Sequence, residues 1–175
     1  MIEAERLSFE LNEEMLKMIA EEYKLEDIAV SFKNAREESV DSAREALHSL
    51  GQQVAKRVLQ LGEEYPDRTY EILKEAVDHT GAYKFPLVPQ RFAEIAYLAL
   101  LDLRFLMVVE NNPKRFVFQI KNCRLRSLIG EGNLKPCRQF CIALVETIFG
   151  DLGLDVSVEI KDIQGCCEIC AERGL

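Results

Sequence analysis

Cysteine is the residue in this sequence whose distribution most suggests chemistry. The first 115 residues contain none, and the last 60 contain all six. Such segregation is unexpected for cysteines that serve only as small apolar residues. Thiolates bind zinc and iron–sulfur clusters, and they also act as nucleophiles. We therefore predict a thiolate-rich site within residues 116–175, positioned and covered by the rest of the chain. The six residues are Cys123, Cys137, Cys141, Cys166, Cys167 and Cys170.

The spacing of these cysteines, C-x13-C-x3-C-x24-C-C-x2-C, suits a site assembled from several elements. Cys137 and Cys141 lie one helical turn apart on one face. A strand end at Cys123 and a hairpin at Cys166 and Cys167 could converge on the start of that helix. Four thiolates suffice for tetrahedral zinc or an iron–sulfur cluster. The predicted metal ligands are thus drawn from Cys123, Cys137, Cys141, Cys166 and Cys167.

Not all of these cysteines can serve together. Cys166 and Cys167 point to opposite faces of a strand, so we expect four ligands or fewer. Cys170, near the end of the sequence, is the expected bystander. The pattern matches neither the C-x2-C pairs of zinc ribbons nor a ferredoxin run. The alternative is that Cys137 and Cys141 are simply buried apolar residues.

A basic window contains two of the cysteines, Cys123 and Cys137. Residues 113–138 carry seven basic side chains and one acid, a net +6, within a chain of net charge −8. Neighbouring cations and a helix N-terminus lower the pKa of a thiol, which would make Cys137 a candidate nucleophile. No general base is evident near it. The window is either a solvated face or a site for an anionic group. The candidate ligand-binding residues are Arg124, Arg126, Arg138 and Phe140, the last from an apolar face that is either core or a lipophilic pocket.

Composition limits the function classes. The net charge of −8 disfavours nucleic acid and anionic membranes as partners. No apolar run reaches the roughly 18 residues of a membrane span, and the acidic first residues do not form a secretory signal. We expect a cytoplasmic protein, in which disulfides are disfavoured and clustered cysteines more often indicate metal binding or reactivity.

The N-terminal part of the chain is predicted to be helical. Amphipathic segments at 12–23 and 25–36 predict a helical arm over residues 1–40, which either folds back or packs against a second subunit. Ser42 and Glu45 form a capping-box pattern before a helix that we expect to end at Gly62. Gly51, inside it, could allow another element to approach closely. A further helix is expected over 67–78.

Residues 41–175 predict one α+β domain. The pattern indicates a loop or extended segment at 82–90, irregular chain at 124–135, helices over 92–101 and from Pro136, and strands at 103–110, 115–122, 155–160 and 166–171. Two hairpins and intervening helices favour an antiparallel sheet of about four strands with helices on one face.

Part of the chain resembles the 4-vinyl reductase or hydrocarbon-binding domain family, which is structurally related to TRAPP trafficking subunits. The resemblance lies in two segments, FVFQIKNC and PCRQFCIALVETIFGDLGLDVSVEIKDIQGCCEI. Cys123, Cys137 and Cys167 occupy positions similar to cysteines of that family. The resemblance implies an α+β fold, dimerisation, binding of small hydrophobic molecules, and cysteines that hold metal.

Two functions follow as hypotheses. One is a small-molecule- or metal-binding module, a sensor or accessory protein and a homodimer, with zinc or an iron–sulfur cluster beside an apolar pocket that takes a small hydrophobic or anionic molecule. The alternative is a thiol-dependent hydrolase similar to aminothiazoline-carboxylate hydrolases, which have a similar strand–Cys–helix layout.

Overall fold

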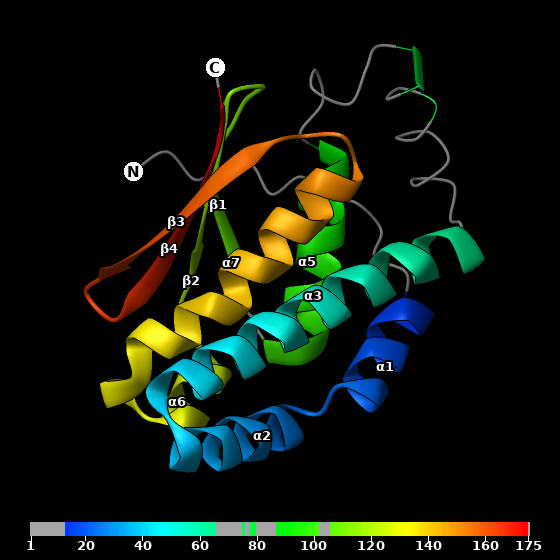
Figure 1. Cartoon of the computed structure of the whole chain (residues 1–175). Coiled ribbons are helices and arrows are strands. Elements are labelled where there is room, and N and C mark those ends of the chain that lie inside the picture. The colour runs from blue at the N-terminus through cyan, green and yellow to red at the C-terminus, as the bar shows by residue number, and fades with distance from the viewer. Residues whose placement is uncertain (1–12, 66–74, 76–77, 80–86, 102–105, 175) are drawn as a thin grey trace.

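A computed structural model describes residues 13–65, 75, 78–79, 87–101 and 106–174 (Figure 1). Most of the helix predicted over 67–78 lies outside these residues. None of the helices in the described ranges is long and apolar enough to cross a membrane. The elements are α1 Glu13–Glu22, α2 Leu25–Glu38, α3 Val40–Glu64, α5 Leu87–Leu101, β1 Leu106–Asn111, β2 Arg115–Ile120, α6 Arg124–Ile129, the short 3-10 helix Glu131–Asn133, α7 Leu134–Asp151, β3 Val156–Ile163 and β4 Cys166–Arg173.

The sheet is built from two hairpins placed side by side. Its strand order is β1-β2-β4-β3, and every neighbouring pair is antiparallel. Phe116, Phe118 and Ile120 are buried, as their alternation predicts, and the helices pack on one face of the sheet (Figure 1). The predicted α+β class with a four-stranded antiparallel sheet is therefore confirmed.

Two glycines of α3 allow close packing. A side chain on Gly51 would clash with the backbone carbonyl of Phe140 in α7, so the close approach suggested by this glycine is present. The prediction that the helix ends at Gly62 is wrong. This glycine lies inside α3, which continues to Glu64, and the ring of Phe92 occupies the space that a side chain would need.

Several boundaries differ from the predictions because local capping and burial override the pattern. The α3 helix begins at Val40, and the Ser39 hydroxyl accepts the Ser42 N–H at 2.9 Å, so the capping box at Ser42 is not the start. The segment expected to be irregular at 124–135 contains α6, where Leu125 and Ile129 are buried one turn apart. The α7 helix starts two residues before Pro136, and α5 already includes residues 87–90.

The described part of the predicted arm folds back onto the rest of the chain. The α1 helix contacts α5 and α3, and α2 contacts α3 and α6. Ile19 and Phe32 are buried in these contacts. The guanidinium of Arg57 in α3 binds both carboxylate oxygens of Glu22 in α1, at 2.8 and 2.9 Å. Residues 13–38 therefore contribute to the same hydrophobic core as the sheet.

We predict that Gly51→Ala lowers the free energy of unfolding by about 1–3 kcal/mol, because the added methyl must displace the backbone of α7. Gly150→Ala is the matched control: it lies in α7 with open space around it, so the better helix propensity of alanine should leave stability unchanged or raise it. Urea denaturation followed by circular dichroism measures both. Equal midpoints for Gly51→Ala and the wild type would contradict the packing described here.

Candidate functional site

The sheet brings Cys123 and Cys167 to the same end. In the ladder between β2 and β4, Cys167 lies opposite Ile120, the last residue of β2. The chain then turns through Asn122, which has a positive φ of 52°, and Cys123 occupies the N-cap position of α6. A strand near the end of the sequence and a strand fifty residues earlier therefore meet at these two thiols.

The α7 helix supplies the next two thiols. Cys137 and Cys141 lie on its buried face together with Phe140, as the helical spacing predicts. The helix packs against α6 and β3, which places its first turns beside the Cys123 end of the sheet. Cys123, Cys137, Cys141 and Cys167, called the thiol cluster below, thus come from three elements, namely the start of α6, α7 and β4.

Electrostatic interactions show that the four thiols are neighbours. Burial first, and then the charges of Cys123 and Cys167, raise the pKa of Cys137 to about 12. Burial, then the charges of Cys137 and Cys123, hold the pKa of Cys141 well above its usual value. The pKa of Cys123 is also raised, by burial first, and Cys167 adds to the rise. Each thiol would therefore be harder to ionise if its neighbours were charged.

The direction of these pKa shifts is opposite to the one expected from the sequence. Arg126 and Arg138 do lower the pKa of Cys137, but burial outweighs them. An ionised sulfur in apolar surroundings loses its hydration, and nearby cations compensate only in part. The buried thiols of the cluster are accordingly protonated at neutral pH, and all are free of disulfide bonds.

Two polar side chains lie against the cluster. Tyr97 of α5 is fully buried, its ring centroid is 5.5 Å from that of Phe118, and burial followed by the charge of Cys141 raises its pKa. Arg126 of α6 pairs with Asp162 of β3 at 3.0 Å, and its pKa is raised by Asp162 first and also by Cys167. Neither Tyr97 nor Asp162 was predicted, because a lone tyrosine in an apolar helix and a lone aspartate in a strand carry no signal in the sequence.

The other two cysteines lie apart from the cluster. Cys166 and Cys170 alternate with Cys167 along β4 and so occupy the other face of the sheet. Cys170 lies opposite Val117, and an interaction with it raises the pKa of Arg115. The structure brings together four of the five predicted ligands and does not bring Cys166 to them.

Two of the four predicted ligand-binding residues lie near the thiol cluster, and two do not. Arg126 lies at the cluster, and Arg138 is close enough to lower the pKa of Cys137. Arg124 instead forms an ion pair with Glu26 of α2. Phe140 is fully buried and belongs to the hydrophobic core.

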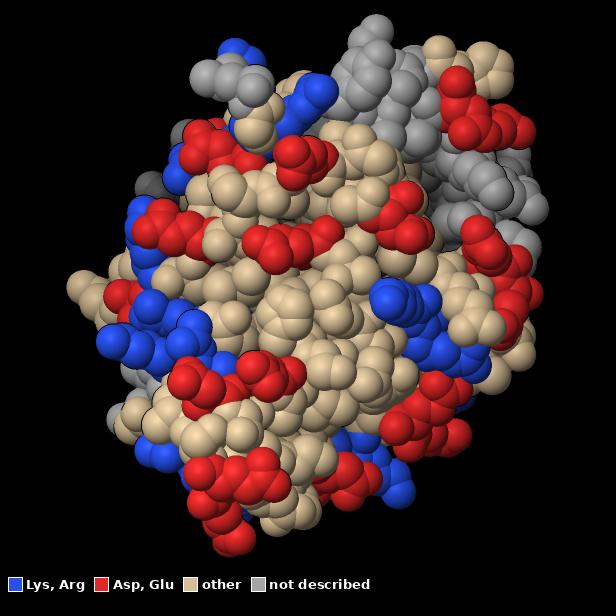
Figure 2. Space-filling view, viewed as in Figure 1, with Lys and Arg blue, Asp and Glu red and all other residues tan. Residues whose placement is uncertain are grey.

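The basic window does not form one continuous patch. Arg115, Arg124 and Arg126 are each paired with a carboxylate, from Glu110, Glu26 and Asp162. Figure 2 shows acidic and basic side chains interspersed around an uncharged area on the face that it displays. Ion pairs within the fold thus neutralise much of the positive charge that was a candidate to bind an anion.

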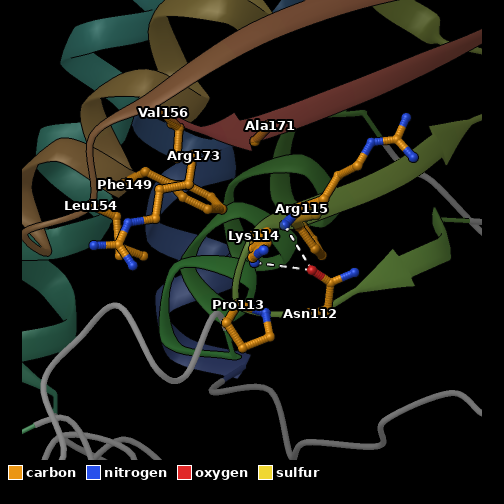
Figure 3. Close-up of a pocket in the computed structure, with 10 residues that line it drawn as sticks. Asn112, Pro113, Lys114, Arg115, Phe149, Leu154, Val156, Ala171 and Arg173 are labelled. Atoms are coloured by element: carbon orange, nitrogen blue, oxygen red, sulfur yellow. Dashed lines mark hydrogen bonds between the residues drawn. The ribbon is translucent and has the colours of Figure 1, made fainter. Parts of the chain in front are cut away.

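The hollows that the structure describes lie away from the thiols. One, shown in Figure 3, lies between the β1–β2 turn and the end of α7, and its floor includes Phe116, Phe149 and Ala171. Its open volume of about 10 Å³ is close to that needed for one water molecule. A second, open hollow follows the turn from α7 to β3, beside Gly153 and Asp155. Neither provides the apolar pocket expected beside the cysteines.

Within the described ranges, no three His, Cys, Asp or Glu side chains are positioned as they stand to hold a metal ion. Cys123, Cys137 and Cys141, whose pKa values are raised, are thus protonated in the present arrangement.

Comparisons with known proteins identify the fold. No protein-family model matches the chain, and no curated protein matches it significantly in sequence. Among solved structures, it is similar to trafficking protein particle complex subunit 3 from Naegleria fowleri, in a structure covalently bound to palmitic acid, with a TM-score of 0.58 and 10% identity over 86% of this chain and 95% of that one. The TRAPP-like fold implied by the sequence resemblance is therefore confirmed, and at this identity the likeness concerns the fold alone.

The raised pKa of Cys137 predicts slow alkylation in the folded protein. At about pH 8, a thiol with a pKa of about 12 is ionised on the order of a thousandfold less than an ordinary one. Iodoacetamide labelling followed by peptide mass spectrometry should show Cys137 protected in native protein and labelled in guanidinium. Equal labelling rates in the two conditions would show that its surroundings are not as described.

Proposed function

We propose that this protein is a binding module, a sensor or accessory subunit, whose site is the thiol cluster and whose ligand is a soft metal ion such as zinc, or an iron–sulfur cluster. One observation supports this most strongly. The start of α6, α7 and β4 together carry four free thiols, and the charges of neighbouring thiols contribute to the raised pKa values of Cys123, Cys137 and Cys141.

Metal binding would explain why thiols are grouped at this place in the fold. Buried thiols that repel one another when ionised stay protonated, and in that state they contribute no more than small apolar side chains would. A divalent cation replaces their protons and compensates their charge, because the thiolate is the form that binds metal. Arg126 and Arg138 would reduce the remaining negative charge of a four-thiolate site.

Binding requires the thiols to move, since no three of them are positioned for a metal as they stand. Cysteine has a single side-chain torsion with three staggered positions, so its sulfur can be redirected without a change of backbone. Two of the thiols lie on one helix and two on the ends of adjoining elements, an arrangement that allows them to turn inward together.

A second candidate ligand is an apolar acyl group. The TRAPP subunit of similar fold was solved covalently bound to palmitic acid. A long chain would need space in the core that the described hollows do not supply. The resemblance to the 4-vinyl reductase domain supports either ligand. Thiol-dependent hydrolysis is less favoured, because a pKa of about 12 leaves Cys137 almost wholly unionised.

We predict that protein purified without oxygen binds about one zinc ion, or one cluster, per chain. Replacing any one of Cys123, Cys137, Cys141 or Cys167 with serine should weaken Co²⁺ or Zn²⁺ binding at least tenfold, because each thiolate is a direct ligand. Cys166→Ser and Cys170→Ser are matched controls that should bind as the wild type does. Elemental analysis and titration of the Co²⁺–thiolate absorption measure both effects.

Intact-mass spectrometry of the same preparation tests the second candidate. An added mass equal to an acyl chain, lost with hydroxylamine, together with metal far below one per chain, would favour the acyl group. Metal binding that is insensitive to all four cluster substitutions would contradict the proposed site.

A further inference from the structure

Strand β3 lies at an edge of the sheet, and its outer side is unpaired within the described residues. In the order β1-β2-β4-β3 its neighbour is β4, and their ladder runs from Val156 to Ile163 without a register shift. The opposite edge strand, β1, has a register shift between Val108 and Glu110. Natural proteins commonly interrupt exposed edges in this way, because a regular edge is a template for another strand. The edge of β3, called the free edge below, has no such interruption.

The turn of the hairpin decides which residues of β3 direct their backbone groups to the free edge. Gln164 and Gly165 have positive φ angles of 53° and 81°, as a two-residue turn of type I′ requires. Such a turn bonds its first residue, Ile163, to its fourth, Cys166, and bonding to one neighbour then alternates along the strand. Odd-numbered residues of β3 therefore bond to β4. The even-numbered residues of 156–162 direct their N–H and C=O groups outward.

Two hydrogen bonds agree with this alternation. The Gly174 N–H donates to the carbonyl of Asp155, an odd-numbered residue. On the outer side, the Val158 N–H donates to the carboxylate of Glu146 in α7. Burial raises the pKa of Glu146, and the charge of His48 and this hydrogen bond lower it in part. Glu146 is exposed and borders the open hollow at the start of β3, so its carboxylate is a partner that an arriving strand can displace.

Side-chain charges on β3 favour one register for pairing with a second copy of the strand. Ile160 faces the core, so Glu159 and Lys161 lie on the face of the sheet away from the helices, where both are exposed. Two copies related by a twofold axis at Ile160 would pair antiparallel, with Glu159 of each copy opposite Lys161 of the other. Shifting the axis to Glu159 or to Lys161 would place like charges opposite each other, which destabilises a strand pair. The register centred on Ile160 joins even-numbered residues to each other, as their outward backbone groups require.

We propose that the free edge is an interface between two copies of this protein, in which antiparallel β3 strands centred on Ile160 join the two four-stranded sheets. Figures 1 and 2 share one view, in which β3 lies in front of β4 and the uncharged area lies over α7 and α3. Because α7 contacts both β3 and α3, this area adjoins the edge. It provides surface beyond that of two strands, and stable interfaces bury roughly 1,200–2,000 Å² in total. Pairing of this kind requires no metal.

Reversing one charge tests the register. In Glu159→Lys, two copies would place lysine opposite lysine twice, so dimerisation should weaken roughly tenfold or more. Lys161→Glu should act in the same way through two pairs of glutamates. Asp41→Lys is the matched control, because Asp41 forms an exposed ion pair with Arg44 at the start of α3 and the net charge changes equally. Sedimentation equilibrium of metal-free protein, from micromolar to near-millimolar concentration, measures each mass against the 20.0 kDa of one chain.

Mixing the two reversed variants tests whether the contact is between chains. A Glu159→Lys chain carries two lysines where a Lys161→Glu chain carries two glutamates, so both cross-chain pairs become attractive. We expect the mixture to recover dimers that contain one chain of each kind, which native mass spectrometry detects. Repair of the ion pair within one chain cannot give this result, since each variant lacks it. Hydrogen exchange at Ile160 and Asp162 should slow as the dimer forms, because their outward N–H groups gain acceptors.

Two outcomes would overturn the interface. One is wild-type protein that stays monomeric throughout this concentration range. The other is a wild-type dimer that neither Glu159→Lys nor Lys161→Glu weakens, with no preference for mixed dimers, because the copies would then meet at another surface. Neither result affects the proposed function, which the metal titrations of the thiol cluster decide.

Discussion

The contact between α3 and α7 is the constraint on which the rest of the structure depends. At Gly51 the backbone of one helix lies against the carbonyl of Phe140 in the other, and no larger residue could occupy that position without moving α7. This contact fixes how α7 lies against the sheet. Cys137 and Cys141 flank Phe140 on the same helix, so the close packing of the two helices also determines where half of the thiol cluster lies.

The other half of the cluster depends on the pairing of two hairpins. The β2 and β4 strands are distant in sequence and pair directly as neighbours in the sheet. Its register sets Cys167 opposite Ile120 and leaves Cys123 just beyond, at the start of α6. A one-residue slip would exchange Cys167 for Cys166 on the helix-covered face, since neighbouring strand residues point to opposite sides.

The sequence predicted the parts of the fold that rest on periodicity. The apolar face of α7 and the alternation of Phe116 to Ile120 are repeated signals, and both were read correctly. It did not predict what depends on single contacts. The start of α3 is decided by one hydroxyl of Ser39, and α6 has only Leu125 and Ile129 to mark it. For the site, the spacing indicated which cysteines could meet, but the effect of burial on their pKa and the presence of Tyr97 arise only from tertiary packing.

Stability alone gives no reason for the composition of this region. Four thiols, a hydroxyl and a guanidinium lie where valine, phenylalanine and methionine would fill the same space. Burial, with a smaller contribution from neighbouring thiol charges, raises the pKa of Cys123, Cys137 and Cys141. Under the proposed function, a metal ion would replace their protons, because the thiolate is the form that binds metal.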